Sequence, residues 1–165
     1  MNCAAQTTRS IEAQVKAAFL YKFCAYVDWP LQTFERPDSP FVIAVIDADP
    51  FADILEQTTT GRNVNGRPVE VHRLRRGASL TGAQIAFIAG SEATALTNAV
   101  ASGKGQSVLI VTDTERGITY GSMINFVLDQ DKVRFDIAPT LAEQNNLKIS
   151  ARLLNVARKV VGRPS

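Results

Sequence analysis

The sequence contains little cysteine and histidine, and this restricts the chemistry that it can support. Its 165 residues include two cysteines, Cys3 and Cys24, and one histidine, His72. Two cysteines do not make a disulfide framework, and three such side chains scattered along the chain do not make a zinc site. A Ser-His-Asp triad would have to use His72, which lies in an alternating segment beside three arginines. We therefore expect no metal, no cofactor and no enzymatic activity.

The sequence also lacks a strong net charge and a long apolar run. Its 18 Lys and Arg against 16 Asp and Glu give a formal charge of +2, too small to indicate nucleic-acid binding without a localised basic face. The nearest candidate, residues 72–76, is interpreted as a solvated strand end. No run approaches the roughly 18 apolar residues that span a bilayer. We expect neither nucleic-acid binding nor membrane insertion.

Motifs for phosphate binding and nucleophilic catalysis are missing as well. The segment 103–105 does not have the spacing of a phosphate loop, and Gly121-Ser122-Met123 does not match a nucleophile elbow. Asp47 and Asp49 follow a buried strand, as in the acidic pocket of receiver domains, but no lysine ends the last predicted parallel strand. Asp49 is therefore interpreted as the cap of a helix that begins with Pro50.

The first helix predicted by the sequence covers residues 12–27. Residues 1–10 are polar and lack the apolar core of a signal peptide, so they are expected to form a disordered tail before one domain at 11–161. The helix is apolar over most of its circumference, which indicates either a core helix or one that buries a face against a partner. The candidate interface residues on and just after it are Lys16, Phe19, Leu20, Phe23 and Trp29.

The middle of the chain has the pattern of an α/β domain. The continuous apolar run 41–46 predicts a strand covered on both faces, and 68–74 alternates as a strand with one solvated face. Helices are predicted at 51–57 and at 91–101, the second capped by Ser91. Two more strands are predicted at 84–88 and 107–112. This order predicts a single domain with a mixed, mostly parallel sheet flanked by helices.

The C-terminal part predicts a β-hairpin followed by a long helix. Strands are expected at 123–128 and 132–137 around a turn at 129–131. Thr140 with Glu143 three residues later has the pattern of a capping box, from which a long helix is predicted, either straight or bent near Asn145-Asn146. Facing strands could bring Asn125 close to Arg134, either for a structural hydrogen bond or, as the less favoured alternative, for catalysis.

Three blocks of the sequence together resemble the YfiR family. They are AAFLYKFCAYVDWP (17–30), GSMINFVLDQDKVRFDI (121–137) and LKISARLLNVA (147–157). The resemblance extends over nearly the whole chain and implies an α/β protein of the periplasm, here as a mature chain without its signal peptide. It further implies a homodimer that binds the periplasmic part of a membrane diguanylate cyclase and represses cyclic di-GMP synthesis.

The resemblance also implies a small-ligand pocket near the LKIS segment. Lys148 and Ser150 are the side chains available there, and we add Arg134 and Asn125 as candidate ligand-binding residues. Family members carry two disulfides, at positions that we align with Ala44 and Ala83 and with Ile118 and Asn125. Because this chain has no cysteine at these positions, redox control by that route is not expected.

Two functions follow as expectations. The first is a periplasmic repressor that acts by direct contact with a membrane diguanylate cyclase or another membrane sensor. The alternative is a small-ligand-binding sensor that serves a histidine kinase or an outer-membrane uptake system.

Overall fold

An eight-stranded sheet runs through the computed structural model, which describes residues 3–90 and 93–162. The strand order is β10-β8-β7-β6-β5-β2-β4-β3. Neighbours from β4 to β7 pair in parallel, whereas β3 and β8 pair antiparallel to β4 and β7. The strands are β2 (Phe41–Ile46), β3 (Asn63–Val64), β4 (Arg67–Leu74), β5 (Ile85–Ile88), β6 (Leu109–Thr112), β7 (Ile124–Asp129), β8 (Lys132–Ile137) and β10 (Lys159–Val160).

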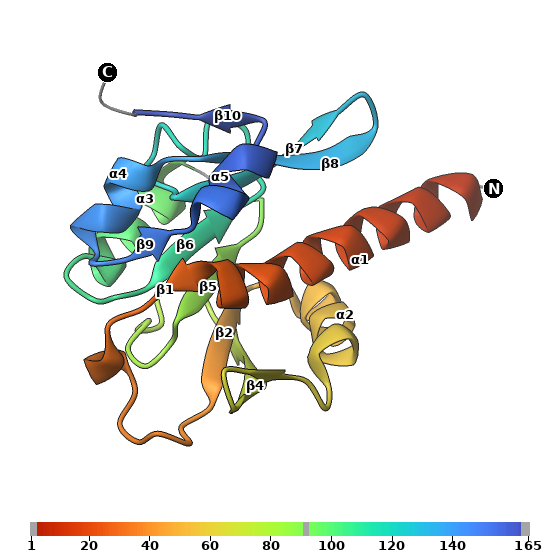
Figure 1. Cartoon of the computed structure of the whole chain (residues 1–165). Coiled ribbons are helices and arrows are strands. Elements are labelled where there is room, and N and C mark those ends of the chain that lie inside the picture. Colours follow the sequence, from red (N-terminus) through yellow and green to blue (C-terminus); the bar gives the residue numbers. More distant parts are fainter. Residues whose placement is uncertain (1–2, 91–92, 163–165) are drawn as a thin grey trace.

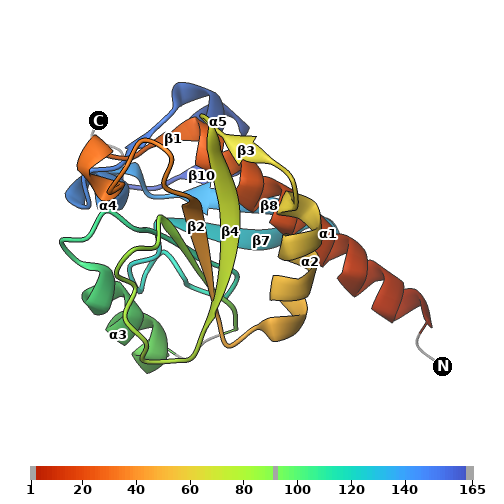
Figure 2. The same ribbon diagram turned by 90° about the horizontal axis from the view of Figure 1, so that it is seen from below.

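The predicted fold class is confirmed: the chain forms one α/β domain with a mostly parallel sheet. Every residue of β2, β5 and β6 is buried, as expected for parallel strands that are covered on both faces. The helices are α1 (Cys3–Tyr26), α2 (Asp49–Thr59), α3 (Ala93–Gly103), α4 (Pro139–Gln144) and α5 (Ala151–Val156), with a 3-10 turn, η1 (Leu31–Thr33). Figure 2 shows α1 and α2 on one side of β2 and β4, and α3 on the other. Ser91, the predicted cap of α3, lies outside the described residues.

Helix α1 starts earlier than the sequence predicts. Residues 3–10, for which a disordered tail was expected, continue the helix, so the predicted boundary at residue 11 falls inside it. The N-terminal part of α1 extends well beyond the sheet (Figure 1). The helix ends at Tyr26, just before the predicted break at Asp28-Trp29-Pro30, because Val27–Asp28 forms strand β1 and pairs with β9 (Lys148–Ile149).

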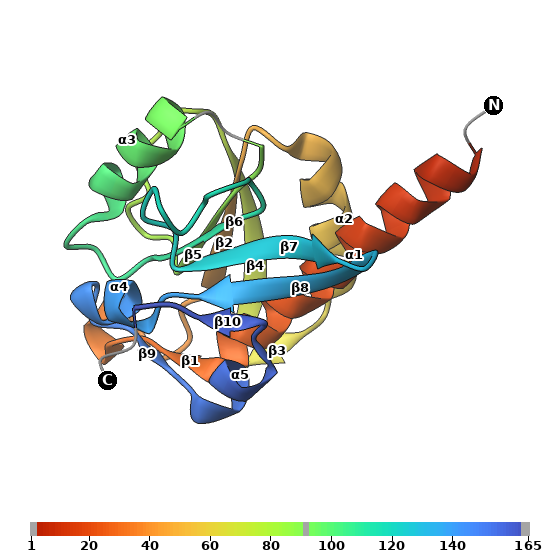
Figure 3. The same ribbon diagram turned by 90° about the horizontal axis from the view of Figure 1, so that it is seen from above.

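The apolar face of α1 packs into the core of its own chain. Phe19 and Phe23 meet Phe126 and Phe135 of the β7–β8 hairpin, with ring centroids 5.2–6.2 Å apart. Leu20 and Phe23 are 0% exposed. Figure 3 shows the hairpin running alongside α1. The predicted interface role is therefore wrong for Leu20 and Phe23: their apolar character is explained by the core.

The hairpin is confirmed, but the single long helix after it is wrong. Gln130 and Asp131 both have positive φ, the geometry that suits a tight two-residue turn. After α4, Asn146 adopts φ +61°, a conformation that asparagine tolerates, and the helix ends. The Asn145 side chain donates to the carbonyls of Gly103 and Val108, at 3.3 and 3.1 Å. The chain then forms β9, the short helix α5 and β10 instead of one continuous helix.

Candidate functional site

Asn125 and Arg134, predicted as neighbours in the hairpin, are not opposite each other, and their described side chains bond to other partners. Asn125 is paired in register with Asp136, whereas Arg134 is opposite Val127. Asn125 is 4% exposed, and its side chain accepts a hydrogen bond from Thr112 Oγ1 (2.6 Å) and donates one to the carbonyl of Thr114 (2.9 Å). Arg134 lies at the surface, with Nη1 3.8 Å from Asp129 Oδ2. Asn125 is thus a structural residue.

Asn125 belongs to a buried polar cluster between β6 and β7. Thr112 Oγ1 also lies 2.8 Å from Ser122 Oγ, and Ser122 Oγ donates to the carbonyl of Ile124 at 2.7 Å. Gly117 packs so closely on this cluster that a Cβ there would lie 2.6 Å from Asn125 Oδ1. The cluster therefore fixes the loop that follows β6, and its polar atoms are used internally.

A charged cavity of about 590 Å³ adjoins this cluster. Lys16 Nζ lies 3.0 Å from Asp113 Oδ2 on one side of it. On the other side, Arg158 makes two hydrogen bonds to the Asp136 carboxylate, at 2.9 and 2.7 Å. These bonds raise the pKa of the Arg158 guanidinium, so it stays charged at all ordinary pH values. Both pairs hold separate elements together, and neither provides a free base or nucleophile.

The predicted interface residues Lys16 and Trp29 also have internal partners. The Lys16 side chain is 17% exposed and pairs with Asp113. Trp29 Nε1 donates to the carbonyl of Gln84 at 3.0 Å, and its ring meets Phe41 edge-on at 4.9 Å. Phe19, another predicted interface residue, is partly exposed and packs against the core.

Lys148 and Ser150, the predicted ligand residues, have different roles in the structure. Ser150 Oγ accepts from the Arg152 amide at 3.1 Å and so caps α5. Its own amide donates to the carbonyl of Tyr26. Lys148 is exposed in β9 and has no ion pair among the described residues. Neither residue is among those that line the charged cavity.

A hollow does lie close to this segment, between α1 and α5. Its volume is about 430 Å³, and we call it the α1–α5 hollow; it is lined by Phe19, Lys22, Tyr26, Arg152, Leu153 and Val156. Val156 is 56% exposed and Tyr26 is 37% exposed, while Lys22 Nζ lies 5.8 Å from the Phe19 ring centroid. An apolar surface beside two cations suits an acidic ligand or partner segment with an apolar side chain.

Sequence reasoning missed Tyr26, Arg152 and Val156 as surface candidates. Phe19, Lys22 and Tyr26 follow helical spacing (i, i+3, i+7) on α1, so a signal on that helix was present. Their meeting with Arg152 and Val156 depends on the pairing of β1 with β9, which places α5 beside the end of α1. That long-range pairing has no local sequence signal.

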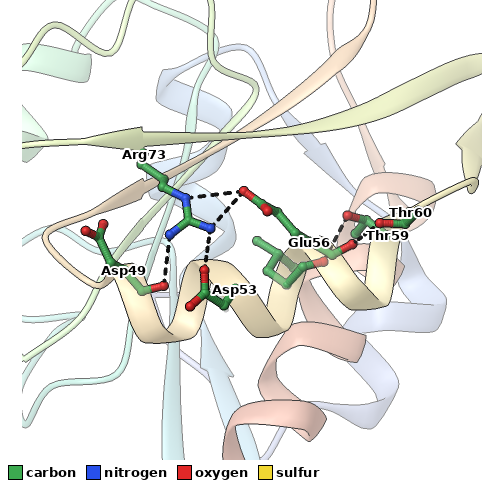
Figure 4. Close-up of polar contacts among 7 residues, drawn as sticks. Asp49, Asp53, Glu56, Thr59, Thr60 and Arg73 are labelled. Carbon is green, nitrogen blue, oxygen red and sulfur yellow. Dashed lines mark hydrogen bonds and ion pairs between the residues drawn. The ribbon is translucent and has the colours of Figure 1, made fainter.

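Two carboxylates of α2, those of Asp53 and Glu56, join this helix to β4. Arg73 of β4 bonds Asp53 Oδ1 (2.5 Å), Glu56 Oε1 (3.0 Å) and the backbone carbonyl of Asp49 (3.3 Å), as Figure 4 shows. The hydrogen bond to Asp53 is the main cause that raises the pKa of Arg73, and the hydrogen bond to Glu56 is the next largest. The cap of α2 is Ala48, so the prediction that Asp49 caps it is wrong; Asp49 is in the first turn.

The last catalytic candidate from the sequence is the histidine. His72 is exposed, with Nε2 3.1 Å from Glu70 Oε1. Among residues 3–90 and 93–162, no group of three or more His, Cys, Asp and Glu side chains could hold a metal ion. The same residues include no helix that is long and apolar enough to cross a membrane.

One of the two disulfide positions taken from the resemblance does not fit the sheet. Ala44 pairs with Ala86 of β5, so Ala83 is displaced by three residues, or about 10 Å along the strands. A disulfide needs Cα atoms within about 7 Å, so positions 44 and 83 are too far apart to be bridged. The alignment of these two alanines with a family disulfide is therefore wrong. Ile118 and Asn125, by contrast, line the same charged cavity.

Comparison with known proteins identifies a family for this chain. A family model described as YfiR/HmsC-like matches residues 13–158, which is most of the chain. No curated protein matches the sequence. The matched range begins within α1 and ends just before β10. It therefore includes the hairpin, all residues that line the α1–α5 hollow, and the four phenylalanines that pack between α1 and the hairpin. The chain belongs to the YfiR/HmsC-like family.

Proposed function

We propose that this protein is a periplasmic regulator that binds the periplasmic part of a membrane diguanylate cyclase and lowers cyclic di-GMP synthesis. The observation that carries the proposal is the family match over residues 13–158. The family is a regulatory one, and repression of such a cyclase is the role that the resemblance implies for its members.

The arrangement of reactive side chains supports binding rather than turnover. Four charged groups of the charged cavity are joined in pairs, Lys16 with Asp113 and Arg158 with Asp136. The thiol of Cys24 is buried and lies 3.4 Å from the carbonyl of Leu20. A nucleophile needs a neighbouring base within hydrogen-bond reach, and the described residues of these sites do not provide that pairing.

The α1–α5 hollow is the surface that we propose for the partner. It exposes Tyr26 and Val156 beside the cations Lys22 and Arg152. Aromatic, apolar and arginine side chains in this arrangement are typical of the centre of a protein interface. The expected occupant is a segment of the cyclase that inserts an apolar side chain and carries acidic residues around it.

Co-purification with the periplasmic domain of a cyclase encoded nearby tests this proposal. Tyr26→Glu and Val156→Glu are expected to weaken binding at least about tenfold, the effect of losing one interface anchor. Leu128→Glu is the matched control, since Leu128 is 54% exposed and does not line the hollow. Equal loss with all three variants, or no binding by the wild-type chain at micromolar concentration, would contradict the proposal.

A second candidate function is favoured by the size of the same hollow. A volume of about 430 Å³ is within the usual range for small-molecule sites. The chain would then be a ligand sensor for a histidine kinase or an outer-membrane uptake system. Aromatic or nucleotide ligands should raise its melting temperature, and Val156→Glu should remove that effect.

The formation of a homodimer also stays a prediction, and light scattering is the measurement that tests it.

A further inference from the structure

The parallel sheet has a topological switch point between β2 and β5. From β2 the chain passes through α2 to β4 on one side, and from β5 it passes through α3 to β6 on the other. Ile46 and Ile88, the last residues of β2 and β5, are paired in register. In open α/β sheets, the crevice beyond the carboxyl ends of two such strands is where ligands bind.

A cavity of about 450 Å³ opens at this point. Its floor is apolar and consists of the buried side chains of Ile46, Leu80 and Ile88. One wall is the loop after β4, where Gly77 has φ +87°. The other wall is one face of α3, at spacing i, i+3, i+4 and i+7: Ala95, Asn98, Ala99 and Ser102. Because these side chains are small, α3 does not fill the space above the strand ends.

Among the polar side chains that line this cavity, Arg76 and Asn98 carry N–H donors with hydrogen-bonding capacity left. Arg76 Nε forms an ion pair with Asp47 Oδ2 at 3.7 Å, which is longer than a hydrogen bond, and the Arg76 side chain is 59% exposed. The Asp47 carboxylate instead accepts from the Arg76 backbone amide at 3.1 Å. Asn98 is exposed, and its amide has no hydrogen-bond partner within the described part of the chain. An arginine and a side-chain amide together match a carboxylate group.

We propose that this switch-point cavity binds a small organic carboxylate with a compact apolar body. The apolar part would lie on Ile46, Leu80 and Ile88, and the carboxylate would face Arg76 and Asn98. A nucleotide fits less well, because the floor is apolar and one arginine does not neutralise a phosphate chain. The site is separate from the α1–α5 hollow, and the inference does not depend on the proposed function.

A titration of the isotope-labelled chain with naphthoate, followed by NMR, tests the inference. Chemical-shift changes are expected at the ends of β2 and β5 and along α3. The uncharged naphthamide should bind about tenfold more weakly, which is the fold-change of one charge-assisted hydrogen bond. Changes confined to α1 and α5, or equal affinity for the two probes, would overturn the inference.

Variants separate this cavity from the rest of the surface. Ala99→Leu fills it and should abolish naphthoate binding, whereas Ala101→Leu, an exposed position on the same helix outside the lining, should not. Arg76→Gln, at an exposed site that does not depend on core packing, should make naphthoate and naphthamide bind alike. Retention of the preference for the anion in Arg76→Gln, or loss of naphthoate binding in Tyr26→Glu, would overturn the inference. Because none of these measurements involves the cyclase, failure of the proposed function leaves their outcome unaffected.

Discussion

Lys16 Nζ lies 3.0 Å from Asp113 Oδ2, although the two residues are 97 positions apart in the chain. The pair joins α1 to the end of β6, and both side chains are less than one-fifth exposed. Asp113 Oδ1 also accepts from the Gly90 amide at 3.0 Å. A single carboxylate thus connects α1, the end of β6 and the loop that follows β5.

Lys16→Met is expected to lower the free energy of unfolding by about 1.5–3 kcal/mol, since the mostly buried Asp113 carboxylate loses its charged partner. Lys22→Met on the same helix is the control. Lys22 is exposed and lies over the Phe19 ring, so its loss should cost about 1 kcal/mol or less. Urea denaturation measures both values, and equal losses would show that the ion pair does not hold α1.

Leu20→Glu tests whether the apolar face of α1 is core. Leu20 is 0% exposed, so a carboxylate there would be buried without a partner, which is expected to unfold the chain. Ala18→Glu, at an exposed position of the same helix, should leave the far-UV circular dichroism spectrum and melting temperature nearly unchanged. A folded, monomeric Leu20→Glu protein would indicate that Leu20 is in a subunit interface after all.

Gly117→Ala should disrupt the buried polar cluster between β6 and β7. The added Cβ would meet Thr112 Oγ1 and Asn125 Oδ1, so we expect a loss of about 2–4 kcal/mol from overpacking and a broken hydrogen bond. Gly105→Ala, with φ +80° and open space around it, should cost about 1 kcal/mol. In an Asn125→Ala background the Gly117→Ala cost should shrink. Strict additivity of the two substitutions would contradict the proposed contact.

Burial of Cys24 predicts a pH dependence. Burial raises the pKa of its thiol far above the ordinary value of 9.0, so the folded chain keeps the proton that the unfolded chain releases. The folded state then binds more protons, and the contribution of Cys24 to stability is complete below pH 9 and declines above it, by up to about 1.4 kcal/mol per pH unit. The stability difference between wild type and Cys24→Ala should therefore decrease from pH 8 to pH 10, and a constant difference would contradict this account.

The same burial predicts that Cys24 does not react in the folded protein. Thiol reagents attack the thiolate, which is both disfavoured and inaccessible here. In a Cys3→Ser background, a chromogenic disulfide reagent should therefore detect no thiol until denaturant is added. Rapid labelling under native conditions would show that Cys24 is open to redox chemistry.

Local sequence patterns were sufficient to predict the hairpin and the other long strands of the sheet, but not the two-residue edge strands β3 and β10. The run 41–46 is apolar at every position and forms a strand buried on both faces, and the alternation in 68–74 gives a strand with one exposed face. The sequence allowed a bend near Asn145-Asn146 but did not predict that α4 ends there, because the stop depends on Asn145 reaching the carbonyls of Gly103 and Val108. Such a contact between distant segments has no periodicity along the sequence.

The candidate sites were harder to predict for the same reason. Lys16, Asn125 and Trp29 are conspicuous in the sequence, yet each is committed to a partner within the fold. The α1–α5 hollow and the switch-point cavity depend on which elements meet, and on small side chains such as Ala99 that leave space. A small residue that leaves a cavity open is hard to recognise in a sequence, because alanine is also a common residue in helices.

Binding to the periplasmic domain of a diguanylate cyclase from the same organism tests the central claim most directly. In isothermal titration calorimetry with purified proteins, we expect a Kd in the micromolar range or tighter, at least about tenfold weaker for Val156→Glu and unchanged for Leu128→Glu. Absence of binding by the wild-type chain, or equal binding by the Val156→Glu variant, would contradict the account of this protein as a regulator that acts through the α1–α5 hollow.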